Sequence, residues 1–363
     1  MNSVNRHAQK TQTGFTLVEF MIAITLGVAL IAGLITAFLG SKRTSELNST
    51  LAELQETGRF ALDSMIRDLR MAGFQGCANI SSNPATVRAN VAPTEDFIED
   101  SLKVFEVQSA SNWNPSPHST FTIPTTTAVP VPGTHAVSVQ FGSPTTYQIQ
   151  PMNNTLAPIV VTSDNSDLIR GDLAIVSDCS GADIFEISDE TGGILLHGGG
   201  VNGGDDRLSA PYGQGSDQNQ PRVMRFEANI YFVGDTGRVN AENVPIRALY
   251  RQTLPYSQPP IEMAEGVENL RIRLGVEDPQ NPGDITFVSP NHALLATHRV
   301  RSVQIGFLMQ SYSPIASEPD TRTYQIAGYN IPSGSPTVTD GNTHASDRKM
   351  RLPFNSTVSI RNR

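Results

Sequence analysis

Residues 15–40 read FTLVEFMIAITLGVALIAGLITAFLG, and Glu19 carries the single charge in this run. About 20 apolar residues are enough for a helix to cross the hydrocarbon core of a bilayer, so the run is long enough to span a membrane. The preceding residues 1–14, MNSVNRHAQKTQTG, contain Arg6 and Lys10 but no acid. Because basic residues favour the cytoplasmic side of a span, we expect the N-terminus to stay in the cytoplasm and the rest to be exported.

This N-terminus differs from an ordinary secretory signal peptide in two ways. A secretory signal has a small-residue cleavage site after its apolar core, whereas here no Ala-x-Ala-like site follows residue 40 and Gly14 precedes the run. In addition, Glu19 places a carboxylate inside a spanning segment, which costs free energy and by default marks a function with a partner. The simpler alternative is a plain membrane anchor that tolerates one glutamate near its cytoplasmic end.

Residues 14–19 read GFTLVE, and this segment, with its basic leader and the apolar run behind it, resembles a class III prepilin signal. The resemblance implies that a membrane-embedded prepilin peptidase cleaves the chain after Gly14 and N-methylates Phe15, the new amino terminus. Glu19 is then an assembly residue and not a catalytic one. Inside a fibre of packed N-terminal helices its carboxylate needs a cation, which the methylated ammonium of Phe15 on an adjacent subunit supplies.

Beyond the apolar run the sequence keeps the periodicity of a helix. Lys42 and Arg43 mark the end of the run, where basic side chains reach the membrane interface. We expect one helix from about Phe15 to Met71, which ends in the glycine-containing stretch 71–76. Residues at spacings of three and four form its apolar face, namely Leu47, Leu51, Leu54, Gly58, Ala61, Met65 and Leu69.

Composition constrains the rest of the chain. The 363 residues include 29 Gly and 24 Pro, which suits a loop-rich β protein better than a helical enzyme. The net charge of −9 argues against a nucleic-acid partner. We therefore expect an α+β fold, in which the long N-terminal helix packs on a large, loop-rich antiparallel β domain. The predicted strands are 135–141, 145–150, 172–178, 182–188, 223–233, 247–254, 267–276, 299–310 and 356–363.

Three stretches are predicted as loops. Residues 80–135 are rich in Ser, Thr, Asn and Pro, and we expect few regular elements there. Residues 197–220 contain too many glycines to pack, and residues 313–349 also indicate a surface loop. Either of the last two suits a ligand-binding or metal-binding loop or a plain surface excursion, and the sequence leaves this open.

The two cysteines, Cys77 and Cys179, lie in the part that we expect to be exported. Oxidising compartments form disulfides, so we predict a bridge between them; the alternative is two unpaired buried thiols. The bridge would close a loop of about 100 residues and stabilise the fold by a few kcal/mol. It would tie the end of the long helix to the strand at 172–178.

Motifs for catalysis and cofactor binding are absent from the sequence. His197-Gly-Gly-Gly resembles an esterase oxyanion loop, but the chain has no G-x-S-x-G elbow. It also has no H-E-x-x-H motif, no EF-hand loop and no phosphate-binding loop. Two cysteines cannot form a four-cysteine zinc site or an iron–sulfur cluster. We therefore expect no enzymatic activity, no metal and no cofactor.

Four further blocks resemble PilW-type minor pilins of type IV pili: RDLRMAGFQGC (67–77), GDLAIVSDCSGADIFEIS (171–188), EMAEGVENLRIRLGVED (262–278) and DRKMRLPFNSTVSIRN (347–362). The resemblance implies a subunit that joins other minor pilins and the major pilin in a complex that primes pilus assembly. It also implies a place at the pilus tip beside a PilY-type adhesin, and a contribution to twitching motility and adhesion by the fimbrium.

The expected organisation is a cleaved leader (1–14), a membrane-spanning or fibre-core helix (15–40), an amphipathic helix half (41–72) and an exported β domain (73–363). Before assembly the chain would cross the inner membrane once, with its β domain in the periplasm. Two alternatives stay open. One is a J-type minor pseudopilin of type II secretion, for which the domain is large; the other is a membrane-anchored adhesin or hydrolase that joins no fibre.

Overall fold

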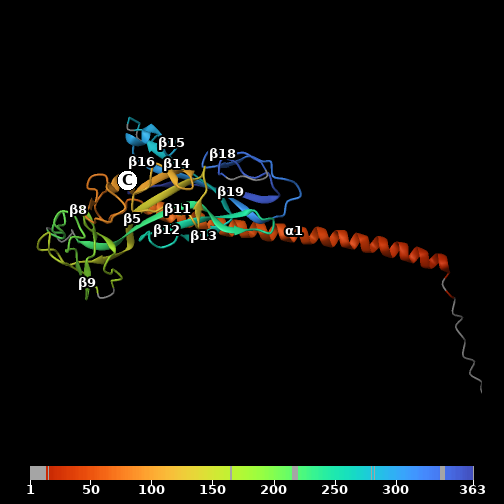
Figure 1. Ribbon diagram of the computed structural model, residues 1–363, viewed down its shortest axis with the longest axis horizontal. Helices are drawn as coiled ribbons and strands as arrows, with labels where there is room; N and C mark the ends of the chain where they lie inside the picture. The colour runs from red at the N-terminus through yellow and green to blue at the C-terminus, as the bar shows by residue number, and fades with distance from the viewer. Residues whose placement is uncertain are drawn as a thin grey trace, which may run out of the picture. The chain divides into compact units, whose positions relative to one another are not determined.

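The computed structural model describes residues 14, 16–163, 166–214, 220–278, 280–281, 283–335 and 340–362. They form one long helix, α1 (Leu17–Met71), followed by a mostly antiparallel β structure (Figure 1), so the predicted α+β class is confirmed. The chain divides into two compact units, an N-terminal unit (Met1–Ala52) and a β unit (Glu53–Arg363).

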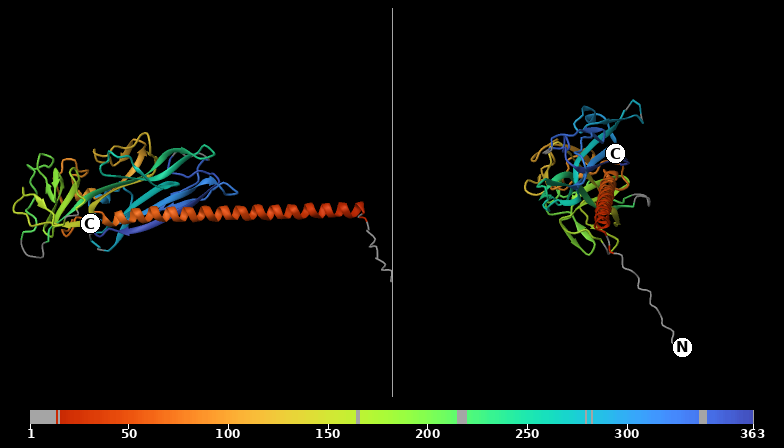
Figure 2. Two further views of the ribbon diagram at one scale, coloured as in Figure 1. Left: turned by 90° about the horizontal axis from the view of Figure 1, so that it is seen from below. Right: turned by 90° about the vertical axis from the view of Figure 1, so that its right-hand side faces the viewer.

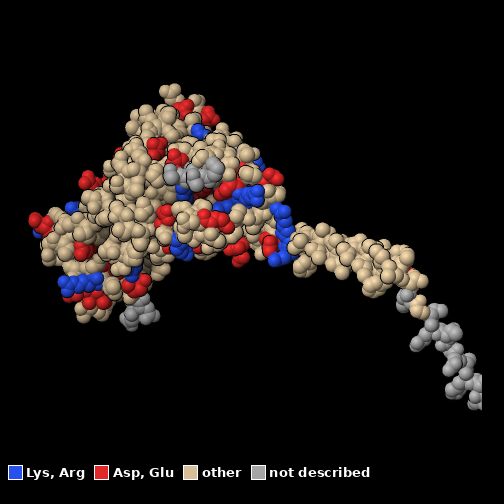
Figure 3. Space-filling model, turned by 45° about the vertical axis from the view of Figure 1, so that its right-hand side comes forward, with Lys and Arg blue, Asp and Glu red and all other residues tan. Residues whose placement is uncertain are grey.

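In the N-terminal unit, α1 has apolar side chains on all sides. Fourteen large apolar side chains between Leu17 and Leu39 are each between 49% and 75% exposed. Figure 3 accordingly shows almost no acidic or basic colour on this part of the helix. It is the one helix among the described residues that is long and apolar enough to cross a membrane. The predicted helix from about Phe15 to Met71 is thus confirmed to within two residues.

In the β unit, α1 buries one face. Its buried residues are Leu54, Gly58, Ala61, Met65 and Leu69, which confirms the predicted apolar face from Leu54 onward. The helix ends where Gly73 adopts a left-handed φ of +73°, a conformation that glycine adopts without a steric penalty. The backbone N–H of Gly73 donates to the carbonyl of Gln140 at 3.0 Å, so the chain turns directly onto the sheet.

The larger sheet is built along β11 (Arg222–Val239), which pairs with β5 (His135–Gln148) on one side. On its other side β11 pairs first with β7 (Leu173–Asp178) and then with β12 (Pro245–Thr253). The remaining strands of this sheet are β1 (Thr86–Val87), β2 (Leu102–Ser109), β3 (Asn112–Asn114), β4 (Val129–Pro130), β8 (Gly181–Glu186) and β13 (Ile261–Glu265).

A second, four-stranded sheet has the order β15-β14-β16-β19 and is antiparallel throughout. Its strands are β14 (Val267–Glu277), β15 (Ile285–Val288), β16 (Val300–Pro314) and β19 (Lys349–Ser359). The other elements are β6 (Ile159–Val160), β9 (Asp189–Thr191), β10 (Ile194–Leu196), β17 (Tyr324–Ile326), β18 (Tyr329–Ile331), α2 (Phe97–Asp100) and the 3-10 helix Ala293–Ala296.

The main core of the β unit forms where α1 and the two sheets meet. Met65 of α1, Val137 of β5 and Phe307 of β16 belong to one cluster of buried side chains. Figure 2 shows this segment of α1 running along strands of both sheets. Asp68 adds polar contacts, because its carboxylate accepts hydrogen bonds from Asn229 Nδ2 at 2.7 Å and from the hydroxyl of Tyr231 at 2.6 Å. The helix is therefore part of the core.

His135 joins the two sheets. Its Nδ1 lies 3.1 Å from the carbonyl of Ile272 in β14, and Arg271 donates to its Nε2 at 3.3 Å. The backbone N–H of Ile272 also donates to Nδ1 at 3.0 Å, so both backbone groups of Ile272 lie against this nitrogen. Burial, and to a smaller extent the charge of Arg271, lower the pKa of His135 to about 3. The ring is therefore neutral at physiological pH.

The strand predictions hold in position but not in detail. Strands predicted at 135–141 and 145–150 form the single strand β5, because a bulge opposite Met224 and Phe226 carries it through the predicted break. The prediction of few regular elements in 80–135 is wrong for β2. Leu102 and Val104 face the main core, whereas Phe105 and Val107 face a second core. With both faces covered, β2 lacks the apolar–polar alternation of a half-buried strand.

The two predicted surface loops also contribute to packing. In 197–220, Leu208 and Tyr212 are buried in a third cluster with Phe185, so the expectation that this stretch is too glycine-rich to pack is wrong. In 313–349, strands β17 and β18 form a hairpin that packs Ile326 on Leu308 of β16. In each stretch a few large apolar residues compensate for the polar composition around them.

We predict that Gly58→Ala destabilises the β unit by about 1–2 kcal/mol. An added Cβ would clash with the ring of Phe354, which stacks on Phe307 with centroids 5.2 Å apart. At an open helical position the same change stabilises a helix by about 1 kcal/mol. Thermal unfolding of the full chain in detergent micelles measures the effect.

Gly40→Ala is the matched control, because nothing lies within 4 Å of the Cβ it would add. Equal stability of Gly58→Ala and wild type would show that the helix does not approach the sheet this closely.

We predict that His135 makes the protein less stable in acid. Its pKa of about 3 in the folded protein lies below the ordinary value near 6.5, so the unfolded chain takes up the proton first. Its stabilisation is complete above pH 6.5 and is lost as pH falls toward 3, at about 1.4 kcal/mol per pH unit. Denaturant unfolding between pH 7 and pH 5 should show a shallower pH dependence for His135→Gln than for wild type. Identical slopes would contradict a buried neutral ring.

Candidate functional site

The start of α1 is held by a reciprocal pair of residues. The backbone N–H and the hydroxyl of Thr16 both donate to Glu19 Oε2 at 3.0 Å, and the backbone N–H of Glu19 donates to Thr16 Oγ1 at 3.3 Å. This is a capping box, in which each side chain satisfies a backbone N–H that the first turn leaves unpaired. Gly14 is exposed just before it, and Phe15 lies outside the described residues.

The capping box gives Glu19 a local role that the sequence analysis missed. The signal was present, because Thr16-Leu-Val-Glu19 has the threonine-x-x-glutamate spacing of a capping box. The box fixes the carboxylate beside the helix N-terminus, where the helix dipole favours negative charge.

Polar side chains in the apolar part of α1 bond to their own helix. The hydroxyl of Thr25 donates to the carbonyl of Ile22 at 2.9 Å, and that of Thr36 to the carbonyl of Gly33 at 2.8 Å. Such local bonds satisfy a hydroxyl without another partner. The bilayer core has no water to bond polar groups, so these groups must find hydrogen-bond partners within the protein. This part of α1 therefore suits a hydrocarbon environment.

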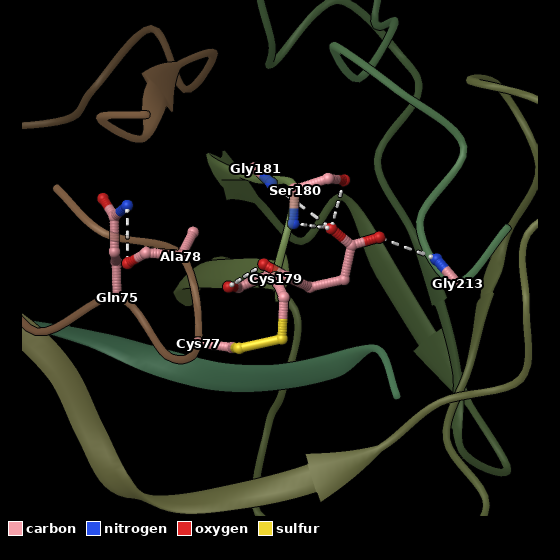
Figure 4. Close-up of a disulfide and its surroundings, with 9 residues drawn as sticks. Gln75, Cys77, Ala78, Cys179, Ser180, Gly181 and Gly213 are labelled. Atoms are coloured by element: carbon pink, nitrogen blue, oxygen red, sulfur yellow. Dashed lines mark hydrogen bonds between the residues drawn. A yellow bond between two sulfur atoms is a disulfide. The ribbon is translucent and has the colours of Figure 1, made fainter. Parts of the chain in front are cut away.

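The structure contains the predicted disulfide between Cys77 and Cys179 (Figure 4). Cys179 directly follows β7 and Cys77 lies six residues after α1, so the bridge ties the end of the helix to that strand as predicted. On one side the carboxylate of Asp178 accepts from the backbone N–H groups of Ser180 and Gly213. The turn that carries Cys179 is thereby fixed.

On the other side of the disulfide, Gln75 organises the loop after α1. Its Nε2 donates to the carbonyls of Ala78 and Asn83, and its Oε1 accepts from the backbone N–H of Ala85. The Gln75 side chain is 1% exposed, so one buried amide satisfies three backbone groups. The loop is therefore held by polar contacts as well as by the bridge.

A buried charged cluster around Arg351 has a structural role. Arg351 of β19 donates to Glu268 at 2.7 Å and to Asp347 at 2.7 Å, and its Nη1 lies 3.7 Å from Asp320. The neighbouring carboxylates raise the pKa of Arg351 against the opposing effect of burial. A cluster whose charges are paired in this way holds β14, β19 and the 313–349 stretch together.

The histidines of the two predicted loops are likewise engaged. His197 faces the carbonyls of Asp206 and Ala157 at 2.8 and 3.0 Å, and His344 Nε2 faces the carbonyl of Arg322 at 2.6 Å. Across the described ranges, no three His, Cys, Asp or Glu side chains gather as metal ligands would.

Two family models match this chain, one at the N-terminus and one in the β unit. Residues 9–35 match the family model of the prokaryotic N-terminal methylation motif, so the start of α1 is similar to that of prepilin-like proteins. Residues 230–362 match the family model of PilW, the type IV pilus-assembly protein W. This match runs from β11 to just beyond β19 and so includes the whole second sheet. Together the two matches confirm the resemblance to a PilW-type minor pilin. The comparisons with curated proteins and with solved structures found no match.

We predict that removing the disulfide with Cys77→Ser/Cys179→Ser lowers the free energy of unfolding by about 2–5 kcal/mol. The bridge spans 102 residues, so it restricts the unfolded chain strongly. Thermal unfolding of the oxidised full chain, compared with the double variant, measures this loss. Peptide mass spectrometry without reductant should recover the two cysteines joined; two free thiols, or equal stability of both proteins, would contradict the bridge.

Proposed function

We propose that the chain is made as a prepilin, is cleaved between Gly14 and Phe15 by prepilin peptidase, and is N-methylated at Phe15. The match of residues 9–35 to the methylation motif carries this proposal. The geometry around the bond supports it, because Gly14 is exposed and regular helix begins only at Leu17.

Before assembly, residues 15–40 would anchor the protein in the inner membrane, with residues 1–14 in the cytoplasm and residues 73–363 in the periplasm. The exposed apolar surface of α1 supports an anchor. The ion pair of Lys42 and Glu46, with nitrogen and oxygen 3.8 Å apart, follows the apolar run directly. Charged residues are unfavourable in the bilayer core, so the membrane span would end before this pair. Residues 41–72 would then form the amphipathic half of the helix.

In the fibre, the apolar part of α1 would exchange lipid for the helices of other pilins. Glu19 is the one charged residue within this apolar surface, and burying it without a cation would be strongly unfavourable. The methylated ammonium of Phe15 on a neighbouring minor or major pilin would provide the cation. The capping box supports this role, because it presents the carboxylate at the helix start.

The PilW match supports a minor pilin of a type IV pilus. We propose that it primes assembly with other minor pilins, stays at the tip beside a PilY-type adhesin, and so supports twitching motility and adhesion without enzymatic activity. The J-type pseudopilin of type II secretion would share the prepilin motif. The match over residues 230–362 is to a pilus-assembly family, which favours the pilus.

We predict that Glu19→Gln leaves cleavage and methylation intact but reduces surface pili at least tenfold, because the neutral amide cannot pair with the Phe15 ammonium. A buried ion pair that loses one partner costs about 3–5 kcal/mol, which exceeds a tenfold change. The measurement complements a strain lacking this gene with each variant and counts sheared pili. Secreted enzymes are assayed in the same cultures.

Glu53→Gln, at an exposed position of the same helix, should restore piliation fully. Normal piliation by Glu19→Gln would remove the assembly role. Normal pili with lost secretion in the deletion strain would instead place the protein in the type II secretion system.

A further inference from the structure

A cavity of about 320 Å³ opens in the β unit beside the short helix α2. Its lining comes from segments far apart in the chain, including residues 93–100, residues 116–118, β2, β5 and Tyr256. None of these residues lies in α1, so the cavity is separate from the residues that carry the proposed function. The cavity lies outside both predicted surface loops, 197–220 and 313–349.

The exposed side of the cavity is negatively charged. Four carboxylates line it, those of Glu95, Asp96, Glu99 and Asp100, against one ammonium, that of Lys103. Lys103 is already engaged, because its Nζ lies 3.2 Å from Asp100 Oδ1. Asp96 caps α2 by accepting from the backbone N–H of Ile98 at 2.8 Å. Among the described residues no ion pair involves Glu95 or Glu99, and both are exposed.

The buried side of the cavity contains an acceptor without a donor. Gln140 of β5 is 3% exposed, and its Nε2 donates to the carbonyl of Pro93 at 3.0 Å. This bond fixes the orientation of the amide, so that Oε1 points away from Pro93. Within the described part of the chain, Gln140 Oε1 receives no hydrogen bond. A buried acceptor left unpaired costs free energy, which a donor entering the cavity would recover.

The walls between these two polar regions are aromatic. Phe105, Phe121 and Tyr256 line the cavity, and the rings of Phe121 and Tyr256 meet edge to face with centroids 5.5 Å apart. Trp113 packs behind them, with ring centroids 5.7 Å from Phe105 and 5.4 Å from Phe121. The walls are therefore held in place before any ligand arrives, which lowers the entropic cost of binding.

We propose that this cavity binds an arginine side chain presented by another protein. A guanidinium is a planar cation that carries five N–H donors and no acceptor, and it stacks on aromatic rings. It would meet Glu95 and Glu99 with its charge, Gln140 Oε1 with an N–H, and one of the two perpendicular rings, Phe121 or Tyr256, with its face. A divalent metal fits less well, because no three of these acids gather as metal ligands in the described structure.

Binding of Nα-acetyl-arginine N-methylamide to the full chain in detergent micelles tests the proposal, with the dissociation constant measured by saturation-transfer NMR. The citrulline analogue has the same shape without the charge, and the lysine analogue has the charge without the planar fork. We expect the arginine compound to bind at least tenfold more tightly than either analogue. Citrulline lacks the charge that strengthens a hydrogen bond, and lysine lacks the planar group that stacks on an aromatic ring.

The variant Glu95→Gln/Glu99→Gln removes the two unpaired charges at exposed positions and should weaken arginine binding about tenfold. Glu318→Gln, at an exposed position that does not line the cavity, is the matched control and should bind like wild type. The proposal is overturned if the arginine compound does not bind at millimolar concentration, if citrulline or lysine binds as tightly, or if the double variant binds as tightly as wild type.

Discussion

One constraint governs this protein: the first part of α1 is apolar on every side and therefore cannot remain in water. Fourteen large apolar side chains from Leu17 to Leu39 are exposed, and at about 25 cal/mol per Å² of apolar surface a bilayer or a bundle of helices is a far better environment. Other features of the segment meet this requirement. Threonine hydroxyls bond to their own helix, the capping box satisfies the first turn, and Glu19 is the only charge.

The second part of the same helix meets a different requirement. From Leu54 to Leu69 it is apolar on one face only, and that face completes a core to which both sheets contribute. Gly58 allows close approach to Phe354, Asp68 binds β11, and the disulfide holds the segment after the helix to β7. The PilW match covers the second sheet, whose side chains receive this face. The residues that match the PilW family model therefore include the strands that pack against α1.

The sequence predicted those features that depend on local pattern or on compartment. Helical spacing located α1, strand-like runs located β7 and β14, and export predicted the Cys77–Cys179 bridge. Features that depend on tertiary burial were missed. Strand β2 is covered on both faces and so shows no alternation, and Tyr212 packs in a stretch whose composition indicates a surface loop. The cavity beside α2 combines Glu99, Gln140 and Tyr256, and no spacing in the sequence brings these residues together.

The central claim is that α1 enters a fibre as a processed N-terminus. The most direct measurement is mass spectrometry of the N-terminal peptide of this chain, recovered from pili sheared off intact cells. The account predicts that the chain is present in the sheared fraction and begins at Phe15 with an N-methyl group. A chain that begins at Met1, or one found only in the membrane fraction of piliated cells, would contradict it.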